Sequence, residues 1–237
     1  DATRHNGASP ETRRRGAERR CRPPKRYHRQ SRNEAKRLEI EVKYQTNQEQ
    51  AAQLWRHPLI APWLGEERQL SMEACYYDSP AGDCARAGFA LRLRREGRRQ
   101  ICAVKGGDPE GSDGVARRIE LEVSADSLAQ GVRSLLQNPS LPRQWAAALS
   151  GPLEQTARMT FTRRAADYRR QNLWIELCYD WGKILANSGQ SPIGECELEL
   201  KLGSEKEFLE LIQALEAQLG WKPWRKSKYA RAKELMK

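Results

Sequence analysis

The 237-residue sequence predicts an α+β fold in which eight β-strands close into a barrel and helices pack on its outside. Three observations support this fold class. Eight short segments alternate between polar and apolar residues, as strands with two different faces do. Amphipathic helical patterns lie between some of these segments. In five of the strands one face carries several charged residues, and an enclosed interior shared by the strands accounts for all five together.

The strands follow one another from Leu38 to the last third of the chain. Their predicted ranges are 38–44, 70–77, 88–95, 100–105, 116–123, 157–165, 172–180 and 194–201. A helix capped by Thr46 or Asn47 should run to about Leu64, with Pro58 and Pro62 interrupting its second half. A second helix should start at Ser124 or Asp126 and run towards Leu136. The clearest helix starts at Ser204, which forms a capping box with Glu207, and stops at Gly220; the segment 224–236 is expected to be helical in part.

Composition and charge define the class of protein. The chain is 38% hydrophobic and 31% charged, and it contains neither a membrane-length apolar run nor a signal-peptide pattern, so we expect a cytoplasmic protein with no membrane partner. The net charge is +11, but residues 1–38 alone hold 13 basic and 4 acidic side chains. We therefore predict a disordered basic extension over residues 1–37 and one domain over residues 38–237.

Nucleic acid could bind only the basic extension, although an extension without a specific role is the favoured interpretation. The body lacks the interleaved basic and aromatic residues of a nucleic-acid platform. The six cysteines of the whole chain are far apart, without a CxxC pair, which indicates reduced thiols. With only three histidines, a metal site would have to rely on carboxylates. The oligomeric state is left open.

The charged strand faces are the unusual feature. In a strand, residues i and i+2 share a face, so Glu39, Glu41 and Lys43 lie opposite Ile40 and Val42. Four further strands repeat this separation of charged from aliphatic residues. Their charged faces carry Arg92 and Arg94; Arg118, Glu120 and Glu122; Glu176 and Asp180; and Glu195, Glu197, Glu199 and Lys201.

Two arrangements satisfy these faces: an open sheet with the charges in bulk water, or a closed sheet with the charges lining a tunnel. Three carboxylates on one strand face repel one another unless a cation intervenes, and neighbouring arginines pose the opposite problem. A polyanion bound together with a divalent metal ion resolves both, which favours the tunnel. Eight strands form a barrel wide enough for one small ligand, and Mg²⁺ prefers oxygen ligands shared with phosphates.

Several motifs, in order along the chain, resemble those of the CYTH superfamily, the triphosphate tunnel metalloenzymes. The sequence Glu39-Ile-Glu41-Val-Lys43 resembles the ExExK signature that opens this family. The other matching motifs are Tyr76-Tyr77-Asp78-Ser79, Ala90-Leu91-Arg92-Leu93-Arg94, Val104-Lys105-Gly106, Arg118-Ile119-Glu120, Asp180-Trp181-Gly182, Glu195-Cys196-Glu197-Leu198-Glu199 and Ser227-Lys228 with Arg231. The resemblance covers about residues 38–233 and is greatest to bacterial inorganic triphosphatases.

The resemblance implies an antiparallel eight-stranded tunnel that hydrolyses triphosphate to pyrophosphate and phosphate with Mg²⁺ or Mn²⁺. It implies metal ligation by Glu39, Glu41 and Glu197 first, with Asp180, Glu195 and Glu199 next. It implies phosphate binding by Lys43, Arg92, Arg94, Lys105, Arg118 and one arginine of the strand 157–165, with Glu120 and Glu122 orienting the cations or a second metal ion. Lys228 would cap the tunnel or lie on the surface, and we count Glu39, Glu41, Lys43, Glu120 and Lys228 as the catalytic candidates.

Two choices remain after the resemblance. Counting back from Asp180 selects Arg163 as the tunnel arginine, whereas alternation with Thr160 and Thr162 selects Arg164; we choose Arg163. The alternative functions are those of a thiamine triphosphatase, a nucleoside triphosphatase or a class IV adenylate cyclase of the same fold, and that of a non-catalytic polyphosphate-binding module. The complete carboxylate set favours catalysis over binding alone.

Overall fold

The computed structural model describes residues 37–107, 114–186 and 189–236, and all eight predicted strands are present in this part of the chain. The predicted extension lies outside the described residues except for Arg37, which begins the first strand, and the predicted domain boundary stays a prediction. The strands are β1 (Arg37–Gln45), β2 (Arg68–Asp78), β3 (Phe89–Glu96), β4 (Arg99–Gly106), β5 (Val115–Ser124), β6 (Glu154–Arg170), β7 (Leu173–Ala186) and β8 (Gly189–Leu202).

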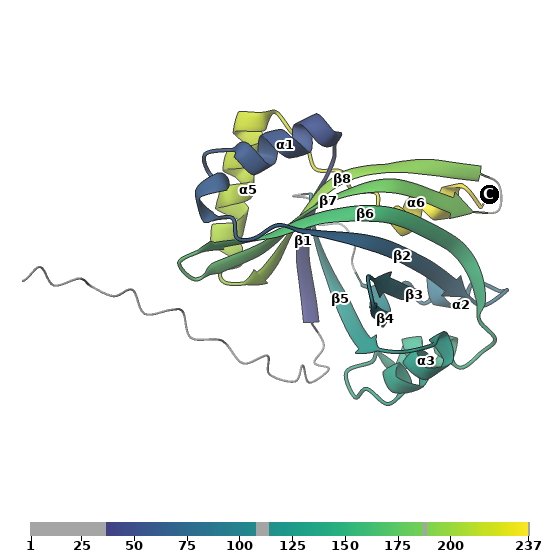
Figure 1. Cartoon of the computed structure of the whole chain (residues 1–237). Helices are drawn as coiled ribbons and strands as arrows, with labels where there is room; N and C mark the ends of the chain where they lie inside the picture. The colour runs from purple at the N-terminus through teal and green to yellow at the C-terminus, as the bar shows by residue number, and fades with distance from the viewer. Residues whose placement is uncertain (1–36, 108–113, 187–188, 237) are drawn as a thin grey trace, which may run out of the picture. The chain divides into compact units, whose positions relative to one another are not determined.

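The strands form a closed barrel in the order β1-β5-β4-β3-β2-β6-β7-β8, and every neighbouring pair is antiparallel (Figure 1). β8 closes the barrel on β1, with Lys43 opposite Glu197. The expected α+β barrel is therefore confirmed. Closure gives the sheet an inside and an outside, so the alternation of each strand decides which side chains enter the tunnel.

Helices cover the aliphatic outer faces, as expected. α1 (Gln48–Arg56) and α5 (Glu205–Leu219) lie together over β1, β7 and β8, where Val42 and Leu198 are fully buried (Figure 1). Asn47 caps α1 by a capping box. The prediction that this helix runs to Leu64 is wrong: it ends before Pro58, which disfavours helical geometry in the residue that precedes it, and a short 3₁₀ turn, η1 (Ala61–Trp63), follows.

A second outer layer covers β3, β4 and β5. It consists of α2 (Asp83–Arg86), α3 (Leu128–Leu136) and α4 (Arg143–Leu149), which enclose buried residues such as Leu91, Leu121 and Leu135. The start of α3 corrects the sequence prediction, because Ser127 and neither Ser124 nor Asp126 caps it. For α5, Ser204 accepts a hydrogen bond from the Glu207 amide, and Gly220 ends the helix at φ 68°.

The last helix, α6 (Lys228–Glu234), packs on the inner face of the barrel. Its Tyr229 and Ala232 join an apolar cluster with Met72, Met159 and Phe161, whose side chains point inward from β2 and β6. Tyr229 stacks on Tyr76 with ring centroids 4.6 Å apart. One part of the tunnel is therefore filled by an apolar plug, and the charged part lies beyond it. Among the described residues, no helix has the length and apolar character to cross a membrane.

Candidate active site in the charged tunnel

The inward strand positions bring together the side chains that the sequence singled out. Register sets the contacts across strands: Glu39 lies opposite Arg118 of β5, Glu41 opposite Glu199 of β8, and Lys105 opposite Glu120. Ion pairs then link all of these strands through the bore. The residues placed in this network are Glu39, Glu41, Lys43, Arg92, Arg94, Lys105, Arg118, Glu120, Arg163, Asp180, Glu195, Glu197, Glu199 and Lys228.

The first group of charges, the Glu39 cluster, consists of Glu39, Glu41, Lys105 and Arg118. Lys105 Nζ contacts Glu39 Oε2 and lies 3.7 Å from Glu41 Oε1, which Arg118 Nη2 also contacts. Glu39 and Glu41 are each only 4% exposed, so their charges act on each other with little screening. The cluster holds two buried carboxylates from one strand face between two cations.

The pKa values of the two glutamates move in opposite directions. Burial, followed by the negative charge of Glu41, raises the pKa of Glu39 to about 8. Burial also acts to raise the pKa of Glu41, but the cations of Lys105 and Lys43 outweigh it and lower that pKa to about 2. Near neutral pH the pair therefore carries one proton, held on Glu39, because burial and the neighbouring charge of Glu41 both disfavour a second negative charge there.

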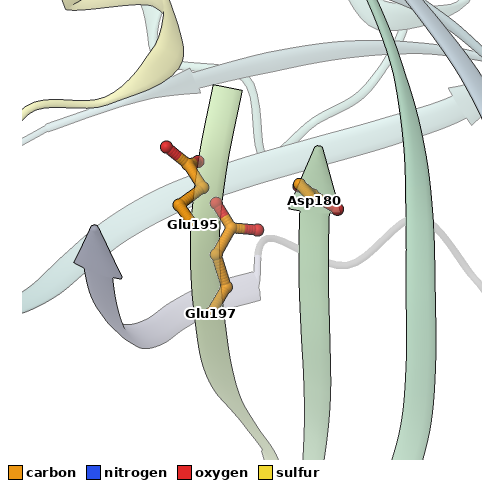
Figure 2. A group of neighbouring side chains, drawn as sticks. All are labelled: Asp180, Glu195 and Glu197. Carbon is orange, nitrogen blue, oxygen red and sulfur yellow. The ribbon is translucent and has the colours of Figure 1, made fainter. Parts of the chain in front are cut away.

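The second group, the Lys228 cluster, consists of Asp180, Glu195, Glu197 and the ammonium group of Lys228. Figure 2 shows Asp180 on β7 beside Glu195 and Glu197 on the adjacent β8, and one oxygen of each lies within 4.8 Å of the others. Lys228 Nζ lies 2.7 Å from Asp180 Oδ2 and 3.0 Å from Glu197 Oε1, and it also contacts Glu195 Oε1. The three carboxylates thus surround a side-chain cation.

Further cations surround the same carboxylates. Lys43 Nζ is 3.0 Å from Glu197 Oε1, and Arg163 reaches Glu197 Oε2 at 2.8 Å. These positive charges lower the pKa of Glu197 against the effect of burial, and the carboxylates in turn raise the pKa of Lys228. Lys43, Arg163 and Lys228 together give this cluster three neighbouring cations, although burial still raises the pKa of Glu195.

Arginine–glutamate pairs form the wall between β3 and β5. Arg92 Nη2 lies 3.2 Å from Glu120, and Arg94 Nη2 lies 3.2 Å from Glu122. The Nε atoms of Arg92, Arg94 and Arg118 are buried and have no hydrogen-bond partner among the described parts of the chain. A buried N–H group without an acceptor is costly, so these three donors mark positions where an anion would be stabilised.

The choice between Arg163 and Arg164 is resolved by register. Arg163 lies opposite Asp180 and binds its carboxylate through two hydrogen bonds of 2.7 Å, inside the tunnel. Arg164 points outward, where it pairs with Glu67 and stacks over Trp55 at 4.7 Å. The structure places Arg163 in the bore, in agreement with the sequence prediction.

Sequence reasoning gave no role to Arg231, although the last motif includes it. Arg231 is buried and its Nη1 lies 3.2 Å from Glu195 Oε2. A spacing of three residues puts Lys228 and Arg231 on one side of a helix, which was the available signal. Tyr76, from the second of the family-like motifs, packs on the inside of the barrel by stacking on Tyr229.

Comparisons with known proteins agree with this geometry. The CYTH domain family model matches residues 37–232. An inorganic triphosphatase from Haemophilus influenzae is 28% identical over 156 residues, which is 63% of this chain and 42% of that protein, so the chain spans less than half the length of this curated relative.

Solved structures share the fold. A proposed adenylyl cyclase from Hippeastrum, reported to have a dominant triphosphatase activity, has a TM-score of 0.53 at 22% identity over 84% of this chain and 97% of its own. A proposed adenylate cyclase from Bacillus halodurans has a TM-score of 0.52 at 17% identity over 81% and 95%. The tunnel, its motifs and the family match lead to one conclusion: the chain belongs to the CYTH domain family.

Proposed function

We propose that this protein hydrolyses inorganic triphosphate to pyrophosphate and phosphate inside the tunnel, with the help of Mg²⁺ or Mn²⁺. The observation that carries the proposal is the enclosed bore of buried paired charges, in which three guanidinium Nε donors have no acceptor within the described residues. A linear chain of phosphoryl groups offers acceptor oxygens along its whole length. The relative from Haemophilus influenzae, an inorganic triphosphatase, adds support for this substrate.

The carboxylates of the Glu39 cluster suit a divalent cation better than those of the Lys228 cluster. Burial, followed by the charge of Glu41, raises the pKa of Glu39, so a divalent cation there would offset the cost of ionising a buried carboxylate. In the other cluster, Lys228 already lies among the three carboxylates. We assign metal ligation first to Glu39 and Glu41, with Glu199 opposite Glu41 on β8. When bound, the metal ion would neutralise and polarise phosphate oxygens.

The cations on both sides of this metal site would bind the phosphate chain. Lys105, Arg92 and Arg94 extend from β4 and β3, with Glu120 and Glu122 holding the two guanidinium groups in place. Lys43, Arg118, Arg163 and Lys228 supply positive charge from the other strands and from α6. Buried cations oriented before the substrate arrives stabilise developing charge without reorganising, which is the largest contribution expected from such a site.

The proposal also covers the cellular compartment and the binding partner of the protein. The five cysteines in the described regions are free thiols, which supports a reducing compartment, and we propose the cytoplasm. The partner is the small-molecule triphosphate; neither a membrane nor a nucleic acid is needed by the barrel.

Phosphate release tests the proposal directly. The purified protein would be assayed with inorganic triphosphate, ATP and thiamine triphosphate, each with Mg²⁺ and with EDTA, and ATP products would be analysed for cyclic AMP. Mg²⁺-dependent turnover that is fastest with inorganic triphosphate supports the proposal. A preference for ATP or thiamine triphosphate would assign another triphosphate substrate, cyclic AMP a cyclase, and tight binding without release a polyphosphate-binding module.

A variant pair makes the assay specific to the metal site. Glu41→Ala should abolish metal-dependent turnover, because it removes an oxygen ligand and the counter-charge of Arg118. Glu66→Ala removes an exposed carboxylate outside the barrel and should leave turnover unchanged. Wild-type turnover in Glu41→Ala would refute the assigned metal role.

A further inference from the structure

Arg231 of α6 contacts Glu195, one of the three carboxylates of the Lys228 cluster. Arg231 is 8% exposed, and its Nη1 lies 3.2 Å from Oε2 of Glu195, which is fully buried. Its Nη2 donates to Ser191 Oγ at 3.2 Å and to the Pro192 carbonyl oxygen, both in β8. The guanidinium group also stacks over Trp224 at 4.7 Å. These contacts fix Arg231 on several sides at once.

The carboxylate of Glu195 connects Arg231 to the bore. Its Oε2 accepts from Arg231, while its Oε1 contacts Lys228 Nζ and lies 3.8 Å from Lys43 Nζ. The two oxygens of one carboxylate are thus divided between Arg231 on one side and the lysines of the charged tunnel on the other. Because a carboxylate is planar and rigid, fixing one oxygen fixes the direction of the other.

The position of Lys228 depends on the orientation of the Glu195 carboxylate. Its ammonium group is held by Asp180 at 2.7 Å, by Glu197 at 3.0 Å and by Glu195. Without Arg231, Oε2 of the buried Glu195 would lose its partner, and the carboxylate would turn both oxygens towards the remaining cations. Lys228 would then move with it, away from Asp180 and Glu197.

We propose that Arg231 is a positioning residue that acts through Glu195 to hold the Lys228 ammonium group at the tunnel end where a phosphate group of the substrate binds. The part of this inference that concerns the substrate rests on the proposed function. The position of Lys228 is independent of the proposed function, because it depends only on the contacts among Arg231, Glu195 and Lys228. A purely structural Arg231 would fasten α6 to β8 and leave Lys228 where it is in every folded molecule.

The experiment uses the full chain with Arg231→Met, Arg231→Lys and the control Lys226→Met. Lys226 forms an exposed ion pair with Glu234 of α6 and contacts no tunnel residue within the described parts of the chain, so its replacement tests loss of a cation beside the same helix. The first readout is the acetylation rate of Lys228, measured by peptide mass spectrometry and normalised to the exposed Lys183. The second is the Kd of inorganic triphosphate, measured by calorimetry in EDTA.

Arg231→Met should speed acetylation of Lys228 several-fold and weaken triphosphate binding about tenfold, the loss expected for one displaced charge-assisted contact. Arg231→Lys keeps a charge for Glu195 and should recover most of both effects, and Lys226→Met should match the wild type. An unchanged acetylation rate of Lys228 in Arg231→Met, with only a lower melting temperature, would overturn the inference. Faster acetylation in a protein that shows no affinity for triphosphate would support the positioning of Lys228 and count against the proposed function.

Discussion

Two glutamates on one face of β1 should respond in opposite ways to the same substitution. Glu39 and Glu41 are separated by one residue, are both almost fully buried and share the cation of Lys105. Glutamine has the size of glutamate and no charge, so Glu39→Gln and Glu41→Gln change charge at constant shape. We expect Glu41→Gln to destabilise the protein near neutral pH and Glu39→Gln to stabilise it.

The magnitudes follow from the pKa values. Lowering the pKa of Glu41 from 4.5 to about 2 is equivalent to about 3 kcal/mol of folding free energy at neutral pH, which Glu41→Gln would remove. The pKa of Glu39, about 8, keeps this side chain neutral in the folded protein, whereas it is ionised in the unfolded chain. That difference favours unfolding by about 3 kcal/mol at pH 7, and Glu39→Gln abolishes it.

The pH dependence has a defined sign. Between pH 4.5 and about 8 the folded protein retains a proton on Glu39 that the unfolded chain has lost, so the free energy of unfolding falls as pH rises through this window. The contribution of Glu41 is present above pH 4.5 and is lost as pH falls towards 2. Urea unfolding of the wild type and both variants in EDTA, at about pH 5 and about pH 8, measures these differences. Equal losses of stability in the two variants would contradict the opposite pKa shifts of Glu39 and Glu41.

Three further predictions concern the tunnel. Binding of Mg²⁺ or Mn²⁺ near pH 7 should release up to one proton, because Glu39 must ionise to bind a metal ion; calorimetry in buffers of different ionisation enthalpy measures it, and metal binding without proton release would contradict the proposed ligand. Arg163→Leu should lower kcat/KM at least about tenfold, while the outward-facing neighbour change Arg164→Leu should not, and similar losses in both would contradict the register argument. Arg94→Ala should raise KM or lower kcat in steady-state kinetics, by an amount equivalent to about 1–3 kcal/mol of transition-state stabilisation. An unaltered kcat/KM would exclude Arg94 from the phosphate site.

The barrel was predictable because strand alternation is a local property. The charged face formed by Glu39, Glu41 and Lys43 can be recognised from the sequence of that strand alone. Barrel closure was then inferred because an enclosed interior accounts for all five charged strand faces together. The capping residues Asn47 and Ser204 were also readable, since a cap acts within three residues. The end of α1 was harder to predict, because helical periodicity continued past Pro58 while the backbone did not.

The inner plug was not predictable in the same way. Met72, Met159 and Phe161 alternate like any buried strand residues, and nothing local distinguishes an apolar interior position from an exterior one. Their partner is Tyr229, which is distant in sequence, so only the folded chain brings them together. Likewise, the sequence left open whether Lys228 caps the tunnel or lies on the surface, and only the fold places it among three carboxylates that by themselves resemble a metal site.

The most direct test of the account is a crystal structure of the full chain with Mn²⁺ and inorganic triphosphate, in which anomalous scattering locates the manganese. We expect manganese bound by oxygens of Glu39 and Glu41, with phosphate oxygens on Arg94 and Lys105 inside the barrel. Manganese and triphosphate bound only to the outer surface, with the bore still closed by its own ion pairs, would contradict it.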